Sequence, residues 1–172
     1  MPIVPEDKDW TWVLERPCDE CGFDPHGFPL ETLSQLILDT GGRWVPVLSR
    51  RGVATRPSDD QWSPLEYACH VRDVFRIYDY RLGLMLAEDD PLFPNWDQDA
   101  SAVAERYGEQ DPHTVLTEIV EAAAKVAHRF GKVGAADWTR PGRRSDNKNF
   151  TIESFARYFI HDPIHHLWDV GG

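Results

Sequence analysis

The sequence predicts an all-α protein: an up-and-down four-helix bundle with long loops between its helices. Apolar residues recur at helical spacing in four segments, helix-start signals precede three of them, and no segment of useful length alternates as a strand does. The chain has 172 residues, which suits one domain with a sizeable core. We expect an irregular N-terminal segment over residues 1–28 and the bundle over residues 29–172.

The first expected helix covers residues 29 to about 48, where apolar side chains recur three and four residues apart. Gly41 and Gly42 lower helix stability, so we expect a bend or a break there. Residues 50–62 form a polar connection to the second helix.

The second expected helix covers residues 64–87 and has a clear start. Ser63 suits the N-cap position, Pro64 suits the first helical position, and Glu66 completes a capping box. A long excursion over residues 88–110 follows, and we expect a short helix in it from about Asp97.

The third expected helix covers residues 112–130, with Asp111 as its cap. A loop rich in Gly, Arg and Asp follows over residues 131–149, and Thr151 caps a fourth helix that ends before the two terminal glycines. The connections before and after the second helix exceed the roughly 2–8 residues usual in bundles. We therefore expect them to cover one end of the bundle or to shape a pocket.

The composition excludes several classes of function. The net charge of −11 opposes an extended nucleic-acid interface and adsorption to anionic lipid. No apolar run approaches the roughly 20 residues of a membrane span, and the N-terminus lacks the pattern of a signal peptide. Three cysteines do not resemble a secreted disulfide framework. We expect a soluble, cytoplasmic protein.

The fourth helix carries the pattern most indicative of chemistry. His161 and His165 are four residues apart, so they lie on one helical face and can grip one cation. His166 is rotated about 140° from His161 at 3.6 residues per turn, and we expect it to face elsewhere. Pro163 removes one helical hydrogen bond and should kink the helix at this point.

Two enzyme classes with related motifs are excluded. A zinc peptidase needs Glu directly after the first histidine, and this chain has Asp162 followed by Pro163. Phosphohydrolases with adjacent His and Asp need another Asp far downstream, where this chain has already ended.

A third ligand should come from another helix of the bundle, and His70 is the best candidate because it sits among residues that should be buried. Three histidines with an open position are typical of catalytic zinc and related centres. The alternative for each histidine is a hydrogen-bonded core residue.

The N-terminal segment contains a second motif. Cys18 and Cys21 form half of a zinc knuckle, with His26 as a candidate third ligand, but a full structural site needs four ligands. A redox pair is the alternative. Cys69 is expected to be a small core residue.

Two patterns together resemble the DinB/YfiT-like superfamily. They are Trp62-Ser-Pro-x-Glu66-x-x-x-His70 at the start of the second helix and His161-Asp-x-x-His165-His166 in the fourth. The resemblance extends from about residue 29 onward, and residues 95–100 and 106–112 are similar to the actinobacterial branch.

The resemblance implies a four-helix bundle that binds one divalent metal ion, zinc, nickel or iron, through His70, His161 and His165. It also implies transfer of a small thiol of the mycothiol or bacillithiol type to an electrophile, because relatives with known activity are thiol transferases. A coordinated thiol is deprotonated, which makes it a strong nucleophile. A metal-dependent hydrolase or isomerase on the same site and a non-enzymatic binding protein remain open.

Five charged residues near these histidines are candidates for supporting roles. Glu66 can orient an imidazole or act as a base, and Arg157 can meet an anionic substrate group, so these two are the candidate catalytic residues. Carboxylates that can orient ligand imidazoles are Asp73, Asp162 and Asp169. A solvated helix face, a cap or a surface ion pair is the alternative for each.

Association and the rim of the pocket complete the expectations. Members of the resembled family commonly pair, and seven tryptophans exceed what a small core readily hides, so we expect a homodimer. Residues 88–100 should form the rim, where Trp96 either stacks on a substrate or packs the loop against the bundle.

Overall fold

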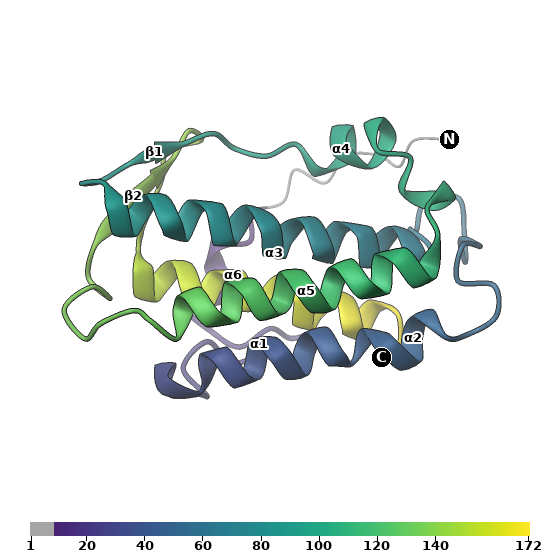
Figure 1. The fold of residues 1–172 in the computed structure, drawn as a ribbon, viewed down its shortest axis with the longest axis horizontal. Coiled ribbons are helices and arrows are strands. Elements are labelled where there is room, and N and C mark those ends of the chain that lie inside the picture. Colours follow the sequence, from purple (N-terminus) through teal and green to yellow (C-terminus); the bar gives the residue numbers. More distant parts are fainter. Residues whose placement is uncertain (1–8) are drawn as a thin grey trace.

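The computed structural model describes residues 9–172 and contains the predicted four-helix bundle (Figure 1). The helices of the bundle are α1 (Leu33–Gly42), which continues into the short α2 (Trp44–Leu48), and α3 (Pro64–Ala87), α5 (Pro112–Phe130) and α6 (Ile152–Asp169). The remaining elements are the 3-10 helices η1 (Thr11–Leu14), η2 (Leu30–Thr32) and η3 (Tyr107–Glu109), helix α4 (Gln98–Ala104), and strands β1 (Leu92–Phe93), β2 (Pro141–Arg144) and β3 (Lys148–Thr151).

Three of the helices begin at the capping residues that the sequence indicated. The Glu66 N–H donates to Ser63 Oγ at 3.2 Å, and the Ser63 N–H donates back to the Glu66 carboxylate at 2.8 Å. Asp111 and Thr151 accept from backbone N–H groups in the same way. The expected break in the first helix falls directly after Gly42, between α1 and α2.

The order of helix directions differs from the predicted up-and-down arrangement. Arg72 on α3 pairs with Glu118 on α5, and Asp79 further along α3 pairs with Arg129 further along α5. Both pairings advance together along the two helices, so α3 and α5 are adjacent and parallel (Figure 1). A short turn joins only antiparallel neighbours, and this pair therefore needs a connection as long as the helices themselves.

Residues 88–111 form this connection and return along the length of α3 (Figure 1). Helix α4 lies in the later part of the connection, near the start of α3. The sequence showed that this loop is unusually long, but it did not show that the two helices it joins are parallel. The short helix expected from about Asp97 is α4, and the Asp97 side chain caps it.

A small sheet means that the protein is not strictly all-α. β2 pairs antiparallel with β3, β1 pairs parallel with β2, and the loop predicted over 131–149 thus contains part of a hairpin. The strands are too short to show a clear alternation, and Asn147 turns the chain with a φ of 67°. The buried Phe93 and Phe150 pack on Phe155 at the start of α6, so the sheet covers this end of the bundle.

The core centres on Phe159 of α6, which is fully buried. Its ring lies 5.9 Å from Phe75 and 4.7 Å from Tyr78 on α3, and 5.7 Å from Phe130 on α5. This one side chain therefore joins three helices. None of the helices within residues 9–172 has both the length and the apolar character required to cross a bilayer.

Replacing Phe159 with Ala should lower the free energy of unfolding by about 3–5 kcal/mol, because the cavity would open between three helices. Urea denaturation measures the change. Val103→Ala is the control, since Val103 is 65% exposed and its truncation should alter stability by no more than about 0.5 kcal/mol. Equal effects of the two substitutions would contradict this placement of the core.

The homodimer remains a prediction. Six of the seven tryptophans are buried or half-buried and only Trp168 is exposed, so the tryptophan count gives little support for an interface. Light scattering at micromolar concentration should give the mass of two chains if the prediction is right, and the mass of one chain if it is wrong.

Candidate metal centre

A cavity of about 850 Å³ lies beside α3 and α6 and contains every histidine singled out in those helices. His70 enters it from α3, and His161, His165 and His166 enter it from α6. The crossover contributes Trp96, and the N-terminal segment and β3 also reach its wall. The expected rim at residues 88–100 is therefore part of the lining.

Two pairs of side chains on α6 define the site. His161 and His165 are one helical turn apart, and so are Asp162 and His166. At 3.6 residues per turn, the second pair is rotated about 100° from the first. The two pairs therefore meet different partners, and the structure divides the metal-type ligands into two groups.

The first group, which we call the open centre, consists of His70, Asp162 and His166. Their ligand atoms lie within 4.8 Å of one another. His70 Nε2 is 3.2 Å from each Asp162 oxygen, and His166 Nε2 is 3.7 Å from Asp162 Oδ2. Two imidazoles and one carboxylate fit a divalent transition-metal ion, and such sets leave positions free for other ligands.

Neighbouring side chains fix the two imidazoles of the open centre. The Asp169 carboxylate lies 2.7 Å from His166 Nδ1, which leaves Nε2 facing Asp162. The Trp96 ring stacks on His70 with 5.3 Å between centroids and 10° between planes. A carboxylate behind a ligand imidazole sets its tautomer and raises its basicity.

Charge in the open centre keeps Asp162 ionised. Burial acts to raise the pKa of this carboxyl, but His70 and His166 act more strongly in the other direction, and the net pKa falls well below its usual range. An ionised carboxylate is the form that binds metal.

The second group, which we call the cysteine–histidine centre, consists of Cys18, Cys21, His161 and His165. Their ligand atoms also lie within 4.8 Å of one another. Burial raises the pKa of Cys21 to about 11 and lowers the pKa of His165, so without a bound cation the thiol is protonated and the imidazole neutral at pH 7.

The predicted metal ligands His70, His161 and His165 all line the cavity, but they do not belong to one ligand group. Within residues 9–172, His70 joins Asp162 and His166, whereas the other two join the cysteines. His166, which we expected to face elsewhere, lies with its ring 4.8 Å from that of His70. The three-histidine set stays a prediction, and metal analysis of the variants described below tests it.

Glu66 has a structural environment. Its carboxylate accepts from the Ser63 N–H and from Arg56, whose Nε lies 2.9 Å from Oε2. Burial acts to raise the pKa of Glu66, but Arg56 and Ser63 outweigh it and the net pKa is lowered. Glu66 is not among the residues that line the cavity. Its predicted role as an orienting group or a base therefore has no support from this geometry.

Arg157 also faces away from the cavity. It donates to the carbonyl oxygens of Pro25 and Phe28, and its Nε donates to Glu153 at 3.1 Å. Its guanidinium lies 5.2 Å from the centre of the Phe28 ring. These contacts fasten the N-terminal segment to α6, and a role with an anionic substrate stays a prediction.

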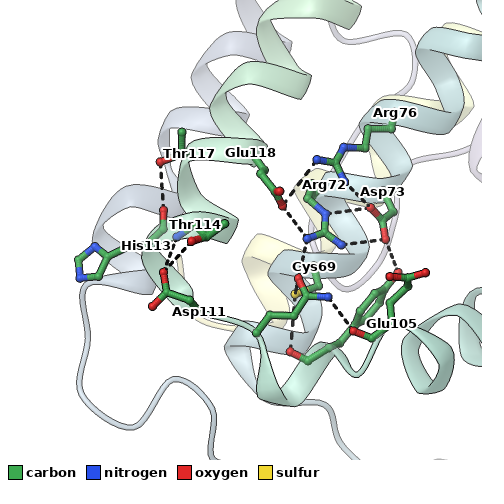
Figure 2. A network of polar contacts seen from close by, with 12 residues as sticks. Cys69, Arg72, Asp73, Arg76, Glu105, Asp111, His113, Thr114, Thr117 and Glu118 are labelled. Atoms are coloured by element: carbon green, nitrogen blue, oxygen red, sulfur yellow. Dashed lines mark hydrogen bonds and ion pairs between the residues drawn. The ribbon is translucent and has the colours of Figure 1, made fainter.

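Asp73 belongs to a different polar network, which Figure 2 shows. The Tyr107 hydroxyl donates to Asp73 at 2.5 Å, and Arg72 donates to the same carboxylate at 2.9 Å. Arg72 also reaches Glu118 on α5. The network joins α3, η3 and α5, and Cys69 lies buried beside it, as expected of a core residue.

Sequence reasoning missed two parts of the site. Asp162 and His166 have the same four-residue spacing as the predicted pair, and this spacing was the available signal. For Cys18 and Cys21 we considered His26 as partner, but His26 is exposed and its Nε2 lies 3.2 Å from the Leu14 carbonyl oxygen. No local pattern connects two cysteines with histidines more than 130 residues away.

Comparison with family models supports the resemblance seen in the sequence. The model described as DinB superfamily matches residues 44–170. The chain belongs to the DinB superfamily. The match includes α3, α5 and α6 and omits Cys18 and Cys21, so the cysteine–histidine centre combines residues inside and outside the matched region.

A solved structure is similar to this chain over most of its length. It is described as "YfiT from Bacillus subtilis is a probable metal-dependent hydrolase with an unusual four-helix bundle topology". The two share 18% identity, with a TM-score of 0.72 over 83% of this chain and 85% of that chain. This likeness concerns the fold. No curated protein sequence matches.

Glu66→Gln should lower the free energy of unfolding by roughly 1–3 kcal/mol, because a buried charged acceptor for Arg56 and for the helix cap is weakened. Metal content of the purified variant should equal that of the wild type. Chemical denaturation and elemental analysis provide the two readouts, with Glu121→Gln on the exposed face of α5 as the control. Unchanged stability together with lost metal would instead favour the predicted role at the metal centre.

Proposed function

We propose that this DinB-superfamily protein is a divalent-metal-dependent enzyme that activates a small nucleophile at the open centre. The observation that carries the proposal is the group of His70, Asp162 and His166, whose ligand atoms lie within 4.8 Å of one another in a cavity of about 850 Å³. Ligand pockets in proteins typically have volumes of roughly 300–1,000 Å³.

A divalent ion at the open centre would lower the pKa of a bound nucleophile and so supply its anion at neutral pH. The chain's residues would hold and orient this ion. Asp162 supplies a negative charge, and Asp169 holds His166 in the tautomer whose Nε2 faces Asp162. The stacked Trp96 limits rotation of His70 and covers one side of the centre.

The nucleophile that we propose first is a low-molecular-weight thiol rich in hydroxyl groups, which is transferred to an electrophile. Aromatic rings of the lining offer flat apolar surfaces, and carboxylates accept hydrogen bonds from hydroxyls. Carboxylates outnumber cations in this lining: Asp9, Glu20, Asp60, Asp97, Asp99, Asp146, Asp162 and Asp169 against Arg81, Arg144 and Lys148.

The cations of the lining are already engaged by the protein. Arg144 pairs with Asp146, Lys148 pairs with Asp9, and Arg81 donates to the Pro94 carbonyl oxygen. The cavity therefore suits a largely neutral substrate better than an anionic one. Of the two thiols that the sequence resemblance implies, this favours the mycothiol type, which is largely neutral.

The second candidate is hydrolysis, with water as the nucleophile at the same centre. The description of YfiT as a probable metal-dependent hydrolase favours it. Both candidates use the same ion and the same ligands, and they differ in what occupies the free position. A cytoplasmic location forms part of the thiol proposal, because small thiols are kept reduced there and the three cysteines of this chain are free.

Loss of a ligand at the open centre should abolish turnover. We expect Asp162→Ala and His166→Ala to lose one equivalent of metal and at least about 100-fold in rate. Asp169→Asn, which removes the carboxylate behind His166 Nδ1, should lose roughly 10–100-fold. The assay follows consumption of mycothiol, bacillithiol and other small thiols with monochlorobimane, beside a panel of ester and amide substrates.

Matched variants separate the competing ligand sets. His113 is exposed on α5, so His113→Ala should keep full activity and metal. If His166→Ala retains both and His161→Ala loses the ion that supports turnover, the three-histidine set is correct and the open centre is not. Turnover of esters or amides without thiol consumption would support the hydrolase and contradict the thiol transferase.

A further inference from the structure

We propose that Cys18, Cys21, His161 and His165 bind a second ion, a structural zinc, which fastens the N-terminal segment to α6. This site is separate from the open centre and does not depend on the proposed reaction. It has four ligands of the types that close a structural zinc site: two cysteines and two histidines.

The distances suit tetrahedral zinc. With Zn–S near 2.3 Å and Zn–N near 2.0 Å, ligand atoms around one tetrahedral ion stand roughly 3.3–3.8 Å apart. Cys18 Sγ lies 3.7 Å from His165 Nδ1, and all four ligand atoms lie within 4.8 Å of one another. Small rotations of the side chains would complete the shell.

The backbone brings the two cysteines together before any ion binds. The Gly22 N–H donates to the Cys18 carbonyl oxygen at 2.9 Å, and the Cys18 N–H donates to the Phe23 carbonyl oxygen at 2.8 Å. Gly22 has a φ of +73°, which glycine adopts without strain. This turn closes residues 18–23 and directs both thiols to the same side of α6.

A carboxylate stands behind one of the ligand imidazoles. His165 Nδ1 faces the sulfur of Cys18, and its other nitrogen, Nε2, lies 3.4 Å from the Glu20 carboxylate. Metal-bound histidines commonly donate their second ring N–H to a carboxylate in this way. Glu20 lies between the two cysteines in the sequence, so the same turn supplies two ligands and this partner.

Three of the four ligands are almost fully buried. Cys18, His161 and His165 are 2%, 4% and 7% exposed, and Cys21 is half-buried. The Trp10 ring lies 5.5 Å from His161 and 5.1 Å from His165, and the Phe23 ring lies 5.5 Å from His161. Zinc binding would release one proton from each thiol, and the two thiolates would balance the charge of the ion in this apolar setting.

The ion would also hold one wall of the cavity. Asp9, Trp10 and Glu20 of the N-terminal segment line that cavity, and Arg157 of α6 donates to the Pro25 carbonyl oxygen of the same segment. Binding energy of a structural zinc contributes directly to folding. Removal of this ion should therefore loosen residues 9–28 and open the cavity.

Cobalt substitution tests the proposal with a readout independent of activity. The wild-type protein loaded with Co²⁺ should show thiolate-to-cobalt charge transfer in the near ultraviolet and intense visible bands of a tetrahedral site. Cys21→Ala should lose the charge-transfer band or reduce it strongly. Cys69→Ala, at a buried cysteine outside the group, and His26→Ala should retain it. Asp162→Ala should retain the band even where it loses turnover, which separates this site from the proposed function.

A measurement on the unmodified chain covers the case in which a cysteine variant does not fold. In the wild type, a strong chelator should make two thiols per chain titratable as the zinc leaves and should expose residues 9–28 to limited proteolysis. The proposal is overturned if the cobalt protein has no charge-transfer band, if His26→Ala abolishes the band, or if both thiols react at the same rate with and without chelator. A disulfide between Cys18 and Cys21 in the metal-loaded protein would overturn it as well.

Discussion

The rest of the site depends on the rotation of about 100° between consecutive residues of one helix. In α6 this rotation places His161 and His165 on one face and Asp162 and His166 on the next. One face meets the N-terminal segment, and the other meets His70 of α3. Two metal-type ligand groups can therefore adjoin each other while sharing no ligand. The helix runs continuously from Ile152 to Asp169 through Pro163, and the kink expected at Pro163 stays a prediction.

The second constraint is the parallel packing of α3 and α5. Two ion pairs span this interface, Arg72 with Glu118 and Asp79 with Arg129. Parallel neighbours need a long return connection, and here residues 88–111 return along α3 and bring Trp96 onto His70. The bundle topology thus supplies the aromatic cover of the open centre. The small sheet lies at the end of the bundle where α3 ends and α6 begins (Figure 1), and its strand β1 belongs to the first part of the connection.

Local signals made much of the fold predictable. Ser63 with Glu66, Asp111 and Thr151 begin helices where the sequence indicates, since caps act within one turn. The parallel direction of α3 and α5 depends on contacts between residues about 50 positions apart, which a single sequence does not reveal. The strands escaped prediction because two to four residues carry no periodicity.

The site was predictable only in its components. The spacing of His161 and His165 marked a turn of α6 that enters the cavity, and the resemblance to the DinB superfamily added His70. The structure groups these histidines with other partners than the prediction did: His161 and His165 lie beside Cys18 and Cys21, which reach α6 only through the tertiary fold. Asp162 was interpreted as a supporting carboxylate, yet its side chain faces His70 directly at 3.2 Å. Ligand type is readable from a sequence, whereas the pairing of ligands from distant segments is not.

The central claim is that α6 supports two metal centres. A crystal structure of the zinc-loaded protein with anomalous scattering measured at the zinc edge tests it most directly. The account predicts two anomalous peaks per chain, one between Cys18 Sγ and His165 Nδ1 and one between His70 Nε2 and the Asp162 carboxylate. A single peak coordinated by His70, His161 and His165, with Cys18 and Cys21 unligated, would contradict it.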